Sequence, residues 1–332
     1  MEKTRVAIKK GNEYGATFEA LRMIGDDIRA AVSARDPRVI FLKPNWVNFR
    51  SDWLSITKLE TIRATIDFFK EIGDFDFLLA DAAPDKRFLK QADHSSLMKE
   101  YPRLKVDDLS DHPSSPVFTA RTIGGEKEVN YYHPPLGSEF LVSLAKMKTH
   151  NIFANTLSLK NVAVGCADKA HKIFFHARTK DGSGAENAIY GDVAAMINFN
   201  LYCGSRAMYP DLAVIDGVHA MEGNGPVEGS PIDMGLVVAS VDPLSADIVA
   251  TEMMGFDPGE IPYIDLMRAE RNPSISVFGC VVQAITKKFK PNICYSRPVG
   301  VMSRLREFAA IYPVPEYRFF VRSGDGPISI AE

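Results

Sequence analysis

The chain has 332 residues, which is long for one typical domain and short for three, so we expect two lobes. Hydrophobic residues make up 46% and charged residues 24%, values that exclude a disordered, collagen-like or coiled-coil protein. The formal net charge of −3 is too close to neutral for a general nucleic-acid binder, so we expect no nucleic-acid partner.

Two further features of the sequence indicate the cellular compartment of the protein. No apolar run approaches the length of a bilayer span, and the amino terminus lacks the apolar core of a signal peptide. We therefore expect a cytoplasmic protein without a membrane partner. The cysteines form no CxxC pair, which argues against an iron–sulfur cluster motif, a cysteine zinc site and a disulfide scaffold. They are Cys166, Cys203, Cys280 and Cys294.

Short apolar runs, rich in β-branched and aromatic residues, predict strands along the chain. The predicted strands are 6–8, 39–42, 75–80, 140–144, 212–215, 236–241 and 275–277. Between them, residues 16–32, 58–72 and 243–254 have helical patterns, and Asp242 is placed to cap the last of these helices. Strands that alternate with helices predict an α/β fold with largely parallel sheets and flanking helices.

The composition in the middle of the chain predicts a boundary between two lobes. Residues 107–132 are rich in Pro, Ser, Thr and Gly, and they predict loops with a hairpin that turns at Gly124 and Gly125. We therefore expect three parts. They are an N-terminal α/β lobe at 1–134, a C-terminal α/β lobe at 135–282 and an extension at 283–332 that wraps the core.

Polar side chains follow five of the predicted strands. They are Lys43 with Asn45, Asp81, the stretch 146–150, Asp216 and Asp242. Ligands of open α/β sheets bind beyond the carboxyl ends of the strands. Any one of these polar residues could simply reflect a strand end that meets solvent, and Asp242 could simply cap a helix. Taken together, the five positions predict a shared cleft.

A basic window lies between residues 146 and 180. It holds seven cationic side chains and one acid, a net charge of +6 in a protein whose net charge is negative. The cations are Lys146, Lys148, Lys160, Lys169, Lys172, Arg178 and Lys180. Such a concentration predicts a small anionic ligand, a carboxylate or a phosphate, although a surface patch without a role would look similar.

Three histidines lie in the same window. They are His150, His171 and His176. On a helix, His171 and His176 would project about 140° apart, so we expect one of them to face the site and choose His176. The loop at 216–226 adds Glu222 and Asn224 beside two glycines that allow close backbone approach to a ligand. A tight structural turn would explain the glycines alone.

Several segments together resemble a known family. KPNW at 43–46, KMKTH at 146–150, TLSLKNVAVG at 156–165, DGVHAMEGNGP at 216–226 and SVDPLSADIVA at 240–250 are similar to the domain of unknown function 362 family. The resemblance covers about residues 5–280. Some members of that family carry a fused ferredoxin-like cluster domain. This chain has no cysteines of that pattern, so electron transfer is not implied for it.

A more distant resemblance, to the nickel-pincer lactate racemase family, implies roles for three residues. That family has a catalytic histidine, then a lysine that anchors a pyridinium dithio-mononucleotide, then a nickel-binding histidine. Here His150, Lys160 and His176 follow this order, at separations of 10 and 16 residues. The resemblance implies acid–base chemistry at His150, anchoring at Lys160 and metal binding at His176. Asp81 stands where that family has a further catalytic histidine.

The predicted site residues form three groups. The expected catalytic residues are His150, Lys160 and Lys148. The residues expected to bind a cofactor or ligand are Lys43, Asn45, Lys146, Asn161 and Asn224. The expected metal ligands are His176, Asp81, Asp216 and Glu222. A divalent metal ion, nickel or iron, is a candidate cofactor, and an organic cofactor stays unidentified.

Two functions from different classes are open. The first is a metal- or metallo-cofactor-dependent enzyme that acts on a small anionic substrate by proton or hydride transfer, as in lactate racemase-like proteins. The second is a non-catalytic binding or carrier protein for an anionic ligand, metal or redox cofactor, because binding needs the lysines but no proton transfer. A nicotinamide dehydrogenase is disfavoured, since no dinucleotide fingerprint follows any predicted strand. Either function is compatible with a homo-oligomer.

Overall fold

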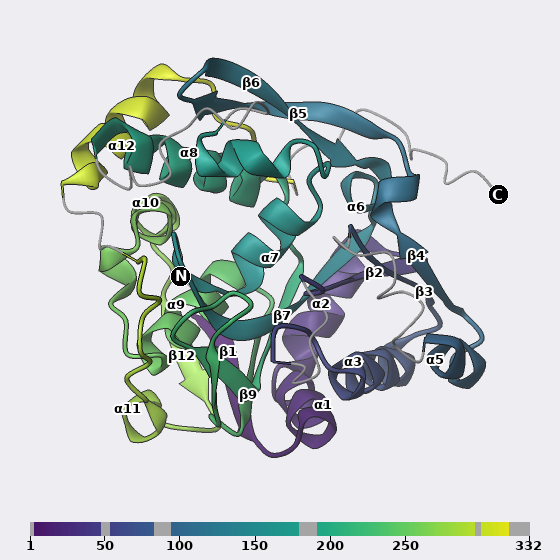
Figure 1. Ribbon diagram of the computed structural model, residues 1–332. Coiled ribbons are helices and arrows are strands. Elements are labelled where there is room, and N and C mark those ends of the chain that lie inside the picture. Colours follow the sequence, from purple (N-terminus) through teal and green to yellow (C-terminus); the bar gives the residue numbers. More distant parts are fainter. Residues whose placement is uncertain (1–2, 48–53, 83–93, 179–190, 296–299, 319–332) are drawn as a thin grey trace.

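A computed structural model describes residues 3–47, 54–82, 94–178, 191–295 and 300–318. Its centre is a sheet in which ten described strands take part, in the order β12-β1-β11-β9-β7-β2-β3-β4, with β10 added to β9 and β8 added to β7 (Figure 1). The strands of the main path are β1 (Thr4–Lys10), β2 (Val39–Pro44), β3 (Asp76–Asp81), β4 (Leu104–Asp108), β7 (Phe140–His150), β9 (Leu212–Glu222), β11 (Leu236–Ser240) and β12 (Ile275–Phe278). The two short additions are β8 (Ala154–Thr156) and β10 (Ser230–Ile232).

The strands that carry the predicted site run parallel. Neighbouring pairs among β9, β7, β2, β3 and β4 are all parallel, so their carboxyl ends meet at one edge of the sheet. Strand β11 reverses the direction, because it pairs antiparallel with both β9 and β1. The prediction of an α/β fold with a largely parallel sheet and flanking helices is confirmed.

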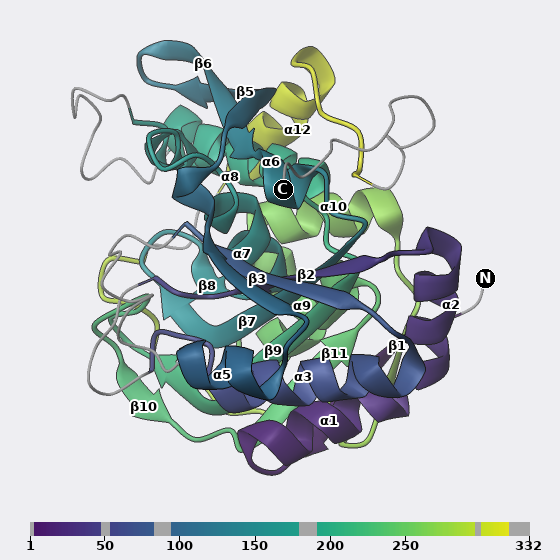
Figure 2. The ribbon, with the colours of Figure 1, turned by 90° about the vertical axis from the view of Figure 1, so that its right-hand side faces the viewer.

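Helices cover both faces of the sheet. The first face is covered by α1 (Glu13–Met23), α2 (Gly25–Arg35) and α3 (Leu59–Ile72). The second face is covered by α7 (Ser158–Gly165), α8 (Gly191–Ala207), α9 (Pro243–Met253), α10 (Pro262–Arg271) and α12 (Val301–Ile311). Figure 2 shows α1 and α3 below the sheet, with α8, α10 and α12 above it. Strand residues alternate between the two cores, as when Leu42 faces the first and Phe41 the second.

Short elements and one hairpin complete the description. The hairpin of β5 (Ser114–Thr122) and β6 (Gly125–Tyr132) confirms the predicted turn, and Gly125 has the positive φ of 90° that the turn needs. The hairpin packs on α8, where Phe118 and Tyr131 enter the core. The remaining elements are α5 (His94–Glu100), η1 (Leu109–Asp111), α6 (His133–Leu136), η2 (Lys172–His176), η3 (Pro258–Glu260) and α11 (Val282–Ile285).

The boundary predicted after residue 134 falls inside the central sheet. Strands β1 to β4 precede it and strands β7 to β12 follow it, yet β2 pairs with β7, and β1 pairs with both β11 and β12. The described part of the predicted extension, residues 283–295 and 300–318, packs onto this body. There α12 contacts α8, and Phe289, Leu305 and Phe308 are buried.

Local sequence signals explain where several helices begin and end. Residues 16–32, predicted as one helix, form parts of α1 and α2, which meet at Ile24. The predicted cap of α9 is confirmed, because the Asp242 carboxylate accepts the backbone N–H of Ser245 at 3.0 Å. In the described part of the chain, no helix is both long and apolar enough to cross a membrane.

Candidate functional site

Strand β7 forms the spine of the predicted site. The apolar pattern predicts a strand that ends at Leu144, but β7 continues to His150 and is buried along its whole length. Because side chains alternate along a strand, Lys146, Lys148 and His150 project to the same side of β7. The strand therefore carries two lysines and a histidine into the interior at the carboxyl edge of the sheet.

Two buried ion pairs link neighbouring strand ends. Lys43 Nζ lies 2.8 Å from Asp81 Oδ1 and joins β2 to β3, and Lys146 Nζ lies 2.7 Å from Asp216 Oδ2 and joins β7 to β9. The second oxygen of Asp81 accepts the N–H of Trp46 at 2.9 Å. These four predicted site residues are thus satisfied by each other, and both pairs stabilise the strand ends.

An amide network connects β2, β7 and α7. Asn45 donates through Nδ2 to Asn161 Oδ1 at 2.9 Å, and its own Oδ1 accepts the Lys148 ammonium at 2.7 Å. Lys148 also donates to the carbonyl oxygen of Ser55 at 2.7 Å. Asn161 Nδ2 donates to Ser143 Oγ at 3.1 Å. The predicted residues Asn45, Lys148 and Asn161 are therefore brought together, and Lys148 is held by neutral oxygens alone.

Lys160, in the first turn of α7, stands apart from the other buried lysines. Its Nζ lies 5.4 Å from the centre of the Phe153 ring, and among the described residues it has no hydrogen-bond or ion-pair partner. Lys160 keeps 8% of its surface exposed, whereas Lys43, Lys146 and Lys148 keep at most 1%. Its ammonium is therefore the one in this set that an incoming ligand reaches.

Two histidines lie beside this lysine. The ring centres of His150 and His176 are 6.3 Å apart, and Phe153 packs against both rings. His171 is held elsewhere, because its Nδ1 accepts the N–H of Asn130 on β6 at 2.9 Å and its ring stacks on Phe174. We call Lys148, His150, Lys160, Lys172 and His176 the cationic site.

The hydrogen bonds of His150 fix the position of its proton. Its Nδ1 accepts the backbone N–H groups of Ile152 at 3.1 Å and Phe153 at 3.4 Å. A neutral imidazole with an accepting Nδ1 carries its proton on Nε2. His150 therefore offers an N–H donor at Nε2, rather than a lone pair that could take a proton or a metal ion.

Burial, together with nearby positive charges, lowers the pKa of every group of the cationic site. Burial lowers the pKa of Lys160 to about 7 and that of Lys172 to about 8, and Lys172 contributes to the shift of Lys160. The pKa of Lys148 is lowered well below its usual value by burial, then by the charges of Lys160 and Lys146. Burial and then Lys160 also lower the pKa of His150 strongly and that of His176 to about 4. Both imidazoles are therefore neutral at pH 7.

Three contributing residues were not among the predicted site residues. Phe153 covers Lys160, and Lys172 donates to the carbonyl oxygen of Ala82 at 3.2 Å. Asp247 on α9 accepts the N–H groups of Ser158 at 2.8 Å and Leu159 at 2.9 Å, which caps α7 just before Lys160. Lys172 lies in the basic window and could have been chosen there. Lys180, the last cation of that window, lies outside the described residues.

Glu222 and Asn224 have a different role. Glu222 Oε2 accepts the N–H of Lys290 at 2.9 Å, and Asn224 Oδ1 accepts the N–H of Ile293 at 3.3 Å. Both side chains thus fasten the C-terminal extension to the loop after β9. The structure does not bring them to the cationic site.

The predicted metal ligands do not converge. In the ranges that the structure describes, which include all four of them, no three His, Cys, Asp or Glu side chains gather as a metal site requires. Asp81 and Asp216 are already paired with lysines, and Glu222 holds the extension. His176 lies near Lys160 and Arg178, whose positive charges repel a cation. This donor set does not fit a divalent metal ion, and no chemical step is assigned to one.

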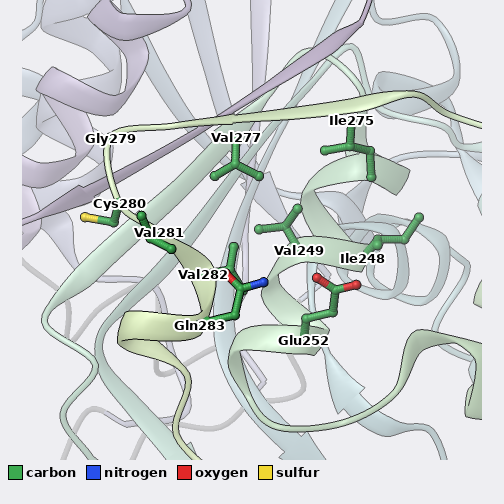
Figure 3. A pocket seen from close by; sticks show the side chains of 10 residues that line it. All are labelled: Ile248, Val249, Glu252, Ile275, Val277, Gly279, Cys280, Val281, Val282 and Gln283. Carbon is green, nitrogen blue, oxygen red and sulfur yellow. The ribbon is translucent and has the colours of Figure 1, made fainter.

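A separate cavity of about 510 Å³ lies between α9, β12 and the start of α11 (Figure 3). Most of its lining residues are apolar, among them Ile248, Val277 and Val282, and one carboxylate, Glu252, lies among them. Burial, followed by the charge of Asp257, raises the pKa of Glu252. None of the predicted site residues lines this cavity, and no lysine, arginine or histidine does. Its wall therefore does not suit an anion.

Residues 40–252 match the model of a family described as "Domain of unknown function (DUF362)". Among curated proteins, the chain is 32% identical over 127 residues to "Thylakoid-associated protein sll1697" of Synechocystis sp. (strain ATCC 27184 / PCC 6803 / Kazusa). That match covers 38% of this chain and 36% of the relative, so it spans about a third of the relative's length. All residues of the cationic site lie within the matched family range.

Proposed function

The chain belongs to the DUF362 family, and on that premise we propose that it binds a small anion, a carboxylate or a phosphate, in the cationic site and acts on it as an enzyme. The family match confirms the resemblance drawn from the sequence segments. The similarity to lactate racemases stays a prediction, as does a cytoplasmic location, since the curated relative is named for thylakoid association.

One observation carries the proposal. Lys148 and Lys160 are buried and Lys172 is partly buried, and no carboxylate of the described residues lies within 4.0 Å of their ammonium groups. Removing an ammonium from water without a counter-ion costs several kcal/mol. An anion placed among the three would offset that cost, whereas Lys43 and Lys146 already have their carboxylates.

The neutral groups of the site supply complementary chemistry. Lys160, with its pKa near 7, is about half neutral at that pH, so its amine can accept a proton from a substrate. The Nε2–H of His150 can donate a hydrogen bond to a substrate oxygen on which negative charge develops. The Lys160 amine would thus take the proton, and the His150 N–H would stabilise the resulting oxyanion. This pair of groups suits the abstraction of a proton from the carbon next to a carboxylate.

A binding experiment tests the proposal. Thermal shifts and calorimetry with acetate, lactate and inorganic phosphate should show saturable binding to the wild-type protein. Lys160→Met should bind at least about tenfold more weakly, because a charge-assisted hydrogen bond is lost. Lys169→Met is the matched control, since Lys169 lies in the same window but is exposed. Equal binding by Lys160→Met and the wild-type protein would refute the site.

A second measurement separates an enzyme from a carrier. Bound L-lactate is followed by proton NMR in heavy water, where abstraction of the α-proton appears as deuterium at the α-carbon. Incorporation that depends on Lys160 supports the enzyme. Saturable binding of all three anions, with no conversion of any of them, would favour the carrier protein that the sequence left open.

A further inference from the structure

Lys160 differs from the other buried lysines in a way that goes beyond anion binding. Lys43 and Lys146 are neutralised by carboxylates, and Lys148 is held by two oxygen acceptors at 2.7 Å. Lys172 donates to one backbone carbonyl. Among the described residues, Lys160 alone of these five has no acceptor, and its Nζ faces an aromatic ring. A nitrogen with no acceptor has its lone pair available once its proton is lost.

We propose that Lys160 is a covalent catalytic residue, whose Nζ forms an imine with the aldehyde or keto carbonyl of a small anionic substrate. The proposal deepens the proposed function and rests on it, since it names the substrate class of the same site. Substrates of this class carry a carboxylate or phosphate together with a carbonyl group, as α-keto acids do.

The step balances without an added oxidant or reductant. The neutral amine attacks the carbonyl carbon, a C–N bond forms, and the carbonyl π electrons move to oxygen, which takes a proton from the nitrogen. The resulting carbinolamine loses its hydroxyl group and the second nitrogen proton as water. The product is an imine between Nζ and the former carbonyl carbon, and hydrolysis reverses every step.

The surroundings of Nζ favour this chemistry in three ways. Phe153 and the buried walls exclude water, which would otherwise solvate the ammonium. Lys172, whose pKa stays near 8, carries positive charge at pH 7 for the carboxylate or phosphate of the substrate, which leaves the neutral form of Lys160 free to attack the carbonyl. Burial also keeps a large fraction of Lys160 neutral at pH 7, against on the order of one part in 10³ for an ordinary lysine.

Reductive trapping on the full chain tests the proposal. The protein is incubated at pH 7 with pyruvate or glyoxylate and sodium cyanoborohydride, which delivers hydride to an imine carbon and leaves a stable secondary amine. Intact mass should show one bound equivalent, and peptide mapping should place it at Lys160. Lactate and acetate, which lack an aldehyde or keto carbonyl, should leave no adduct.

The matched variant is Lys160→Arg, which keeps the positive charge but cannot form an imine. It should still bind lactate and phosphate and should lose the adduct, while Lys169→Arg should keep it. Peptide mapping of the wild-type protein compares Lys160 with the exposed Lys169 directly, so the test holds even where the variant is unstable. Labelling of Lys160 should exceed that of Lys169 at least about a hundredfold. This is less than the ratio of their neutral amine fractions at pH 7, because the substrate reaches the buried Lys160 less easily.

The outcomes distinguish the two proposals. Saturable anion binding without an adduct at Lys160 would overturn the imine and leave the proposed function intact. Equal labelling of Lys160 and Lys169 would also overturn it, since surface lysines react in that way. Neither binding nor an adduct would overturn both.

Discussion

Gly165 at the end of α7 lies directly against the ammonium of Lys43. A Cβ added at Gly165 would stand 2.6 Å from Lys43 Nζ and 2.7 Å from its Cε, closer than such atoms approach in proteins. Lys43 cannot simply turn aside, because Asp81 holds it at 2.8 Å in a buried pair. The absence of a side chain at Gly165 therefore makes room for the ion pair between β2 and β3.

Replacement of Gly165 by alanine should destabilise the protein by about 1–3 kcal/mol, because Lys43 must leave its carboxylate or α7 must shift. Helix propensity alone would predict the opposite sign. Urea denaturation measures the difference. Gly25→Ala is the control, since a Cβ there first meets the exposed end of Arg29, and it should change the free energy of unfolding by less than about 0.5 kcal/mol. An equal effect of the two variants would contradict this role for Gly165.

Lys160→Met should stabilise the ligand-free protein at neutral pH. Because burial lowers the pKa of Lys160 to about 7 in the folded state, the unfolded chain binds more protons between that pH and about 10.4. The wild-type protein thus carries the full cost below pH 7 and loses it as the pH rises. We expect a gain on the order of 2 kcal/mol at pH 6 that shrinks towards pH 10, measured by urea denaturation. A constant gain at every pH, or none, would argue against a buried charge.

Anion binding should be accompanied by proton uptake. The pKa of Lys160 is about 7 and that of Lys172 about 8 in the free protein, and a bound anion raises both, since it favours the ammonium forms. At pH 8 the protein should take up about one proton or more per bound anion, and affinity should therefore fall at least about tenfold per pH unit above pH 8. Calorimetry in buffers of different ionisation enthalpy measures the uptake. Binding without proton exchange at pH 8 would count against these lysines as ligands.

His150 should stay in the Nε2–H form at pH 6.5, where an ordinary imidazole is about half protonated. Its Nδ1 accepts two backbone N–H groups, and burial lowers its pKa well below the usual value, with a smaller contribution from Lys160. Nitrogen NMR of labelled protein distinguishes the two neutral tautomers and the imidazolium. An Nδ1–H signal would assign His150 the opposite role, that of a proton acceptor at Nε2.

The apolar runs predict the strands well, because buried parallel strands are continuous hydrophobic stretches. They do not predict that β7 continues through Lys146 and Lys148, since charged residues look like the end of a strand. Only the partners explain why these lysines are tolerated inside, and Asp216 is 70 residues away from Lys146 along the chain. The sequence does not predict the strand order either, because the strands that pair with β1 lie more than 200 residues later in the chain.

The sequence predicts the surroundings of some site residues correctly and of others incorrectly, depending on whether their partners follow from the strand pairing. Strand ends predict correctly that Lys43, Asn45 and Lys148 share one edge of the sheet, a consequence of parallel pairing. The loop glycines predict that Glu222 and Asn224 face a ligand, but those side chains bind a segment about 70 residues later in the chain. A ring such as Phe153 gives no signal in a sequence, because an aromatic residue is equally common in a core.

Strand β1 is inserted between β11 and β12, so among the described strands it gains its partners only after more than two hundred further residues have left the ribosome. Until then, both of its hydrogen-bonding edges stay unpaired, and that end of the sheet cannot close. Assembly of this end is thus delayed until residues 236–278 are made, and any truncation before them leaves β1 as an exposed template for aggregation.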